Sequence, residues 1–218
     1  MRRNFHKSQR QDVSALNLGN KWNEGWINCV FDIVWQSYDR LLQYYKDTGK
    51  DAKKESEDEI TTALLRFTKI IRGSSPAHFE PLDFVNQPPD KSKTRNRKNN
   101  TNDVGVFFGN EIEKPAFIFE SKKISTLTEK GIASYIEDLQ AYLDEYYGSH
   151  LSESALIAYL HTGTPTKMFE LIKKSIKTKL KQFSTFANRP HQTSEHKKTS
   201  SSLDQKDFLC HHLIFEML

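Results

Sequence analysis

Hydrophobic residues recur at helical spacing in two stretches of the N-terminal third of the chain. In the first stretch, Asn23 to Tyr45, the apolar positions include Trp26, Ile33 and Leu41, and Thr48-Gly49 supplies a stop signal. The second stretch runs from Glu57 to Arg72 and is followed by Gly73. Its inward positions are Ile60, Leu64, Phe67 and Ile71. The pattern predicts two amphipathic helices.

Two apolar runs in the middle of the chain have the character of paired strands. They cover Asn102 to Phe108 and Ala116 to Lys123, and Gly109-Asn110 and Pro115 lie in the short link between them. Short apolar runs joined by a Gly-containing link are typical of a β-hairpin. A weaker strand candidate, Phe79 to Val85, precedes them and contains Pro81, which disfavours a central strand.

The second half of the chain alternates helical and strand patterns. Thr126 and Glu129 have capping-box spacing, and apolar residues then recur at helical spacing from Ile132 to Tyr146. We expect four further segments: a buried strand at 154–160, a helix from Pro165 to Phe183, a loop at 188–206, and a final strand at 208–217. The order predicts an α/β fold with a central mixed β-sheet flanked by helices and an N-terminal helical extension.

The length of 218 residues suits one substantial core. We expect a polar, partly disordered N-terminus at residues 1–20 and a single domain at 21–218, with its N-terminal helix at about 23–47 and its core at about 55–218. The sequence has no apolar run of about 18 residues and no signal-type apolar segment after Met1. We therefore expect a cytoplasmic protein that does not enter a membrane. Cys29 and Cys210 lie in apolar surroundings and are expected to be buried thiols.

The net charge of +4 only slightly favours acidic partners, but the basic residues are unevenly distributed. One segment without any acid comes directly before Asp103 and holds Lys91, Lys93, Arg95, Arg97 and Lys98. A second group, Lys173, Lys174, Lys177 and Lys181, forms a stripe on one side of a predicted helix. Either group has a plain interpretation as a solvated surface. The first is the candidate nucleic-acid-binding segment, because lysine and arginine bind phosphates without regard to sequence.

Candidate chemistry lies on the hairpin. Glu120 and Lys122 project from one face of their strand, and the hairpin brings Asp103 alongside them. The plain alternative is an exposed ion pair on a sheet edge. Ile118 and Ile124 flank the pair on the same face and favour a buried strand instead. Buried carboxylates either change their pKa or acquire a cation, so two acids beside a lysine suit a divalent cation that binds phosphate.

Asp103 with Glu120-Ser121-Lys122, preceded by one amphipathic helix and followed by another, resembles the PD-(D/E)XK nuclease superfamily, which has the restriction-endonuclease-like fold. The resemblance covers residues 55 to 218. It implies that Asp103 and Glu120 bind Mg²⁺ or Mn²⁺ and that Lys122 orients the attacking water. The literal Pro-Asp pair occurs here only as Pro89-Asp90, in the basic loop. Asp103 is the better match because it borders an apolar strand.

The resemblance also implies two accessory residues. The family often carries a glutamate in the helix before the sheet. Glu59 is the best match and would be a metal ligand and catalytic residue, with Glu57 as the substitute. Some branches add a catalytic glutamine after Glu-x-Lys, and Gln140 followed by Tyr142 looks like that feature. Each has a plainer interpretation. Glu59 completes a capping box with Ser56, and Gln140 has the position of an ordinary helix amide.

The sequence thus predicts a Mg²⁺-dependent phosphodiesterase that cuts nucleic acid, with DNA favoured over RNA and internal cleavage over removal of ends. By analogy of fold, we expect a role in restriction or antiviral defence, either as a homodimer or with a partner subunit that carries the sensing function. The alternative is a noncatalytic nucleic-acid-binding or scaffold module that retains the nuclease fold.

Overall fold

The computed structural model describes residues 24–74, 82–86, 103–108, 116–144, 151–198 and 207–217, which form an α/β fold around one seven-stranded sheet. The strands are β1 (Leu82–Asn86), β2 (Val104–Phe108), β3 (Phe117–Ile124), β4 (Glu153–Leu160), β5 (Leu180–Gln182), β6 (His191–Lys197) and β7 (Asp207–Glu216). Their order across the sheet is β1-β2-β3-β4-β7-β6-β5. The three central strands β3, β4 and β7 are parallel, and all other pairs are antiparallel.

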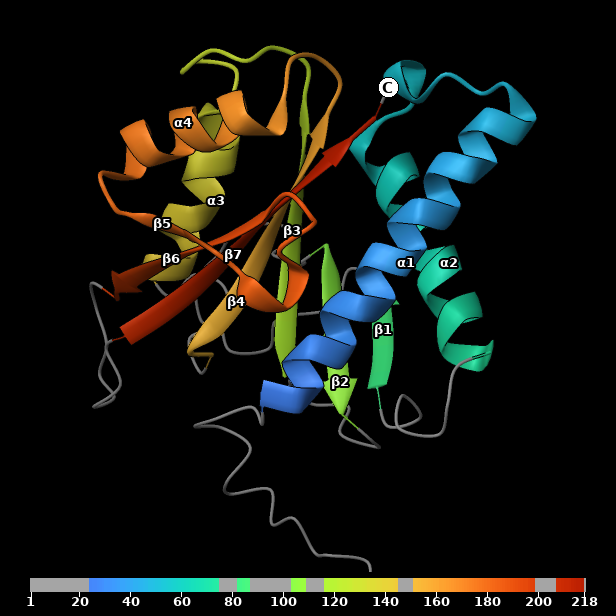
Figure 1. The fold of residues 1–218 in the computed structure, drawn as a ribbon, viewed down its shortest axis with the longest axis horizontal. Helices are drawn as coiled ribbons and strands as arrows, with labels where there is room; N and C mark the ends of the chain where they lie inside the picture. The colour runs from blue at the N-terminus through green and yellow to red at the C-terminus, as the bar shows by residue number, and fades with distance from the viewer. Residues whose placement is uncertain are drawn as a thin grey trace, which may run out of the picture.

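Four helices cover the sheet, two on each face (Figure 1). They are α1 (Glu24–Thr48), α2 (Glu57–Ser74), α3 (Ala133–Leu143) and α4 (Pro165–Ile176), with short 3-10 turns η2 (Ala52–Lys54) and η4 (Ser184–Phe186). The first pair, α1 and α2, packs together on one face, and α3 and α4 lie on the other. The chain therefore buries its central strands between two helical layers.

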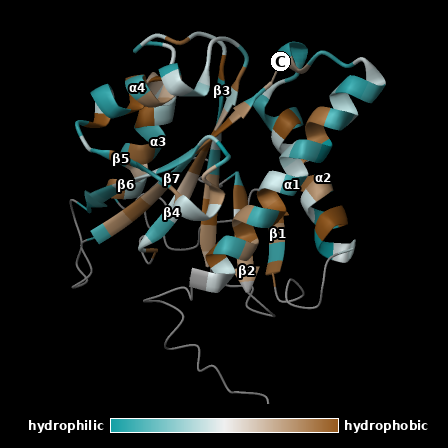
Figure 2. Cartoon of the chain, viewed as in Figure 1, coloured by the Kyte–Doolittle hydropathy of each residue, from teal (hydrophilic) through white to brown (hydrophobic). Residues whose placement is uncertain are grey.

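Alternation along β3 divides the apolar core into two clusters. Phe117 and Phe119 point towards α1, where the Phe117 ring lies 5.6 Å from that of Phe31. Ile118 and Ile124 point to the opposite face and pack with α3 and α4. Figure 2 shows the same arrangement as hydrophobic strands enclosed by helices with hydrophilic outer faces. Polar residues on β3 are consequently held in a buried strand, as the flanking isoleucines predicted.

Most of the predicted elements are confirmed. The two N-terminal helices, the β2–β3 hairpin strands, the strand at 154–160 and the final strand are all present near their expected bounds. The weak strand candidate is present as β1, which begins at Leu82, directly after Pro81. The α/β class, the mixed sheet and the N-terminal helix are likewise confirmed.

The predicted capping box at Thr126 and Glu129 is wrong, because no helix begins there. Residues 126–132 form turns, and α3 begins at Ala133 without a side-chain cap. The turn is tight at Gly131, where a β-carbon would lie 2.1 Å from the carbonyl oxygen of Thr126. Only glycine fits such a close approach of two backbone segments.

Two further predictions are wrong in the C-terminal part of the chain. The helix from Pro165 ends at Ile176, because Lys177 adopts a left-handed conformation with φ of 56°. Phe183, expected on that helix, instead packs its ring 5.8 Å from that of Phe31. The expected loop at 188–206 contains the strand β6, whose polar residues find hydrogen-bond partners within the sheet.

Three other features bear on the predictions. No helix among the described residues is long and apolar enough to cross a bilayer. Cys29 and Cys210 are both free thiols; the predicted burial is confirmed for Cys210 and wrong for Cys29, which is only partly buried. Residues 1–23 and 145–150, which include the N-terminal segment and the expected end of the third helix, lie outside the described residues.

Candidate functional site

The candidate site lies where β2 and β3 part. Their pairing runs from Val106 opposite Phe117 to Val104 opposite Phe119, whereas β3 continues to Ile124. Asp103 directly precedes β2, and its carboxylate contacts Ser121 of β3. Within the described residues, no strand pairs with β3 on this side beyond that point. We call this parting, with Asp103 and residues 120–123, the fork.

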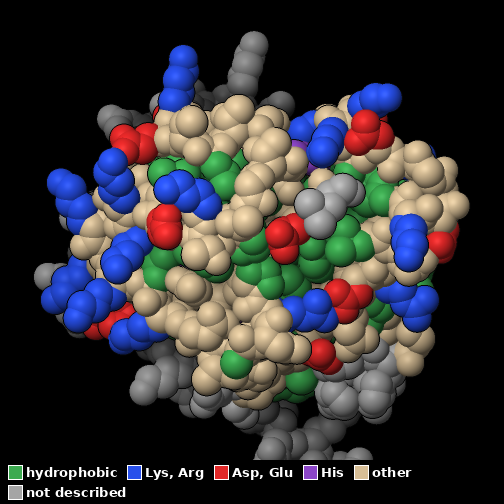
Figure 3. Space-filling view, turned by 45° about the horizontal axis from the view of Figure 1, so that its top comes forward, with side chains coloured by type: hydrophobic (Ala, Val, Ile, Leu, Met, Phe, Trp, Pro, Cys, Tyr) green, Lys and Arg blue, Asp and Glu red, His purple; other side chains and the backbone are tan. Residues whose placement is uncertain are grey.

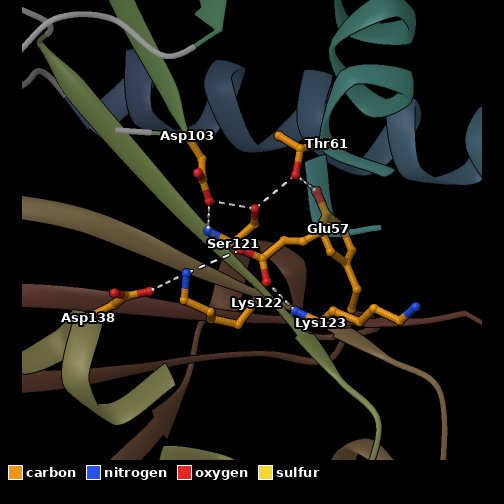
Figure 4. A network of polar contacts seen from close by, with 8 residues as sticks. Glu57, Thr61, Asp103, Ser121, Lys122, Lys123 and Asp138 are labelled. Atoms are coloured by element: carbon orange, nitrogen blue, oxygen red, sulfur yellow. Dashed lines mark hydrogen bonds and ion pairs between the residues drawn. The ribbon is translucent and has the colours of Figure 1, made fainter. Parts of the chain in front are cut away.

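At the fork, carboxylates take the place of a neighbouring strand. The backbone N–H groups of Ser121 and Lys123 point towards the missing partner, because alternate residues of a strand direct their N–H groups to the same side. Asp103 Oδ2 accepts from the Ser121 N–H at 2.7 Å, and Glu57 Oε2 accepts from the Lys123 N–H at 2.7 Å (Figure 4). The backbone of β3 therefore fixes the position of both acids.

A chain of hydroxyl groups supports Asp103 from inside the protein. The Ser121 hydroxyl donates to Asp103 Oδ2 at 2.7 Å and so has no proton left for Thr61, 2.9 Å away. Thr61 must then donate to Ser121, and Tyr159 to Thr61 at 3.1 Å. All three hydroxyl residues are buried. An ionised Asp103 thus sets one direction of donation along the whole chain.

Lys122 lies on the other face of β3 and is held by two acids. Its Nζ is 3.0 Å from Asp138 Oδ2 and 3.2 Å from Glu57 Oε1 (Figure 4). Burial alone would lower the pKa of Lys122, but the nearby charges of Asp138 and Glu57 outweigh it and raise that pKa above its usual value. Lys122 is therefore a fixed cation at neutral pH.

Together with Glu57 and Asp138, the fork carries more negative than positive charge, because these four acids outnumber Lys122 and Lys123. Asp138 comes from α3, and burial raises its pKa to about 6, with Asp103 and Glu57 adding to the rise against the opposing effect of Lys122. Glu120 is 3% exposed. The pKa of the Tyr142 hydroxyl is raised first by burial and then by the charges of nearby groups, which include Glu120, Asp138 and Asp103. Asp138, Glu57 and Asp103 thus act on the ammonium group of Lys122, and Asp103 and Glu57 also act on Asp138. Such an excess of negative charge in a partly buried site favours a cation.

The oxygen atoms at the fork suit a hard divalent cation. Among the described residues, no three Asp, Glu, His or Cys side chains form a group arranged to enclose a metal ion. Mg²⁺ does not require such a group, since it keeps several waters and is commonly bound by one or two carboxylates plus substrate phosphates. Asp103, which contacts Ser121, and Glu120, the residue before Ser121, are the residues that could hold it.

The two helical glutamates that the sequence left open have different surroundings. Glu59 is exposed and closes a capping box, in which its Oε2 accepts from the Ser56 N–H at 2.7 Å and the Ser56 hydroxyl donates to it at 2.9 Å. Glu57, two residues earlier, contacts Lys122 and Lys123. The structure therefore places Glu57 at the fork and Glu59, the preferred match, on the surface.

On α3, the structure brings a different residue to the fork than the one predicted. Gln140 is exposed and donates to Asp144 Oδ1 at 2.9 Å. Asp138 reaches Lys122 instead, and the sequence analysis missed it. Its signal was its spacing, since it lies three residues after Tyr135 and four before Tyr142, both buried on the face towards the sheet.

The two basic segments contribute differently to a nucleic-acid interface. Lys91, Lys93, Arg95, Arg97 and Lys98 lie outside the described residues. Figure 3 shows many lysine and arginine side chains on the side of the molecule where α4 lies. There, Lys174 pairs with Glu129 and Lys181 pairs with Glu195 at 2.6 Å. These lysines belong to a helix and to β5, so they form no single helical stripe.

Comparisons of the chain with protein-family models, with curated proteins and with solved structures find no match. The chemistry available to the chain is that of the fork. It combines several carboxylates, a fixed ammonium and a strand edge whose backbone donors are bonded to side-chain acids, and these could bind a divalent cation and an anionic substrate together.

Proposed function

We propose that this chain is a metal-dependent nuclease of the PD-(D/E)XK type, which hydrolyses phosphodiester bonds with DNA as the favoured substrate. The observation that supports the proposal is the placement of Asp103, which acts electrostatically on Lys122, beside the strand that carries both Glu120 and Lys122. Glu57 adds a helical acid that contacts the lysine. An upstream strand acid, a Glu-x-Lys strand and a helical glutamate are the elements by which the sequence resembles that superfamily.

Each residue at the fork has a distinct role in this mechanism. Asp103 and Glu120 would hold Mg²⁺ or Mn²⁺, which when bound lowers the pKa of a coordinated water and neutralises charge on the phosphate. Lys122 keeps its proton, so it would act as a hydrogen-bond donor that orients the water or stabilises a nonbridging phosphate oxygen. Glu57 would hold Lys122 and the backbone of β3 in place.

Electrostatics explains why the fork would need a cation before it binds a phosphodiester. A phosphate approaching four carboxylates and the two lysines of the fork meets net repulsion. A bound divalent ion reverses much of that repulsion. The basic segment at 91–98 precedes Asp103 by a few residues in the sequence and would add phosphate contacts. These contacts would make binding sensitive to salt and indifferent to base sequence.

The test is a cleavage assay with plasmid, linear DNA and RNA, each with Mg²⁺, Mn²⁺ or EDTA. We expect cleavage of DNA with a divalent ion, none with EDTA, and none for Lys122→Ala or Glu120→Gln. Lys46→Ala, which changes an exposed lysine near the end of α1, is the matched control and should cleave normally. Cleavage that survives in Lys122→Ala would contradict the proposal.

The alternative, a noncatalytic nucleic-acid-binding module, gives a different result in the same experiment. Such a module would bind DNA or RNA in a salt-dependent way and leave it intact with every metal ion tested. Binding without cleavage by the folded protein would therefore replace the nuclease proposal with this one. Whether the protein forms a homodimer is tested by its mass in solution. Whether cleavage needs a sensing partner is tested by adding partner proteins to the assay.

A further inference from the structure

Lys122 is held from two sides of the sheet. Glu57 lies at the start of α2, which packs on the face occupied by α1, whereas Asp138 lies within α3 on the opposite face. The ammonium group on β3 bridges the two carboxylates at 3.2 and 3.0 Å. The orientation of this single side chain therefore depends on both helical layers.

We propose that Asp138 is a positioning residue that fixes the Lys122 ammonium at the fork. Asp138 makes the shorter contact and has the more buried side chain, 14% exposed against 28% for Glu57. Glu57 is divided between two donors, since its other oxygen accepts from the Lys123 N–H. The consequence for catalysis rests on the proposed nuclease function, but the hold of Asp138 on Lys122 does not.

A purely structural role explains this contact less well. A partly buried ion pair pays a desolvation cost that cancels much of its attraction, so it contributes little stability compared with an apolar pair. Apolar contacts already attach α3 to β3, because Tyr135 and Leu139 pack with Ile118 and Ile124. The contact instead determines where a cation points, in a site that also contains Asp103 and Glu57.

The contact can be tested without any nuclease activity, by the reactivity of the Lys122 amine. An amine-reactive acylating reagent is used in limiting amounts, and labelling is quantified by peptide mass spectrometry. Asp138 contacts the Lys122 ammonium at 3.0 Å, so Asp138→Asn should free the amine and increase labelling of Lys122 by about tenfold. The control is Glu137→Gln, an exposed neighbour on the same helix, which should leave labelling unchanged.

Cleavage kinetics test the catalytic consequence. If the wild-type protein cleaves DNA, Asp138→Asn should lower kcat by roughly 10- to 100-fold with little change in KM, because a misplaced catalytic group acts on the chemical step. Asp138→Glu, which keeps the charge, should restore part of the rate. If the wild-type protein does not cleave, the nuclease proposal fails, whereas the labelling result still decides whether Asp138 holds Lys122.

Two results would overturn the inference. One is equal labelling of Lys122 in folded Asp138→Asn and wild-type protein. The other comes from a second variant, which is needed if Asp138→Asn does not fold, as judged by circular dichroism. Glu57→Gln then provides the second variant, and it should retain most of the protection of Lys122 because Asp138 remains. Full exposure of Lys122 in Glu57→Gln would show that Asp138 does not hold it.

Discussion

Asp103 and Ser121 are joined by two hydrogen bonds that end on the same carboxylate oxygen. Both the backbone N–H and the side-chain hydroxyl of Ser121 donate to Asp103 Oδ2 at 2.7 Å. A serine on the face opposite Lys122 thereby positions Asp103, one of the two candidate metal ligands. The residue between the two motif positions of Glu120-Ser121-Lys122 consequently has a structural function of its own.

Ser121→Ala should destabilise the protein. The change removes the hydroxyl that joins Asp103 to Thr61 and leaves the buried Thr61–Tyr159 pair without its acceptor. We expect a loss of about 1–3 kcal/mol in the free energy of unfolding, typical of a buried hydrogen bond that loses one partner. Urea denaturation measures it, with the exposed Ser125→Ala as control. Equal losses for both variants would contradict the hydroxyl chain.

Glu57→Gln should slow cleavage, whereas Glu59→Gln should change only the stability of the protein. Glu57 contacts Lys122 and the β3 backbone, so its substitution should slow cleavage strongly. Glu59 contacts only the start of its own helix among the hydrogen bonds described, so its substitution should lower the melting temperature slightly and leave the cleavage rate unchanged. The two residues have the same chemistry and lie two positions apart. A slower rate in Glu59→Gln alone would restore the sequence-based choice.

Divalent ions should stabilise the wild-type protein. A ligand that binds only the folded state adds about 2.7 kcal/mol at one hundred times its dissociation constant. We therefore expect a higher melting temperature with Mg²⁺ or Mn²⁺ than with EDTA. Glu120→Gln, which removes the charge of the buried candidate ligand, should reduce that increase. An equal increase in both proteins would place the ion elsewhere.

Stability should decline below neutral pH because of histidines buried on both faces of β7. Burial lowers the pKa of His211 and, to about 3, that of His212. Below the ordinary histidine pKa of about 6.5, the unfolded chain binds protons that the folded protein does not. The free energy of unfolding therefore decreases as the pH is lowered. The slope is up to about 1.4 kcal/mol per pH unit for each histidine. Asp138, with its raised pKa, opposes this trend between about pH 6 and 4.

Urea denaturation between pH 7.5 and 5 measures this dependence. His212→Gln should reduce the slope by up to the contribution of one proton, because glutamine does not titrate and can still reach Tyr135 or Ser194. An unchanged slope in that variant would show that His212 titrates normally in the folded protein.

The sequence predicted the elements whose apolar spacing is strong, and it missed those whose burial depends on polar partners. β6 has the sequence His191-Gln192-Thr193-Ser194-Glu195-His196-Lys197, which has no apolar residue to indicate a strand. Its burial depends on contacts with distant residues, such as His191 with His211 and Ser194 with His212. Such pairs form only after the chain has folded, so local pattern cannot show them.

The residues of the candidate site on the strands were predictable from the sequence, whereas those on the helices were not. Asp103, Glu120 and Lys122 are adjacent to a strong strand pattern, and the structure places Glu120 and Lys122 on β3 with Asp103 in contact with Ser121 between them. The choice between Glu57 and Glu59 depended on how α2 is rotated against β3, because two positions on a helix point about 200° apart. The same rotation on α3 decides between Asp138 and Gln140. No local signal in either helix determines that angle.

The parting of β2 from β3 also affects how inactive variants are designed. Asp103 and Glu57 occupy two backbone donors that another protein's strand could otherwise pair with. Replacing both acids with apolar residues would open an adhesive edge in the middle of the sheet. A doubly substituted protein should therefore self-associate, and single isosteric amides are the sounder choice for a catalytically silent reference.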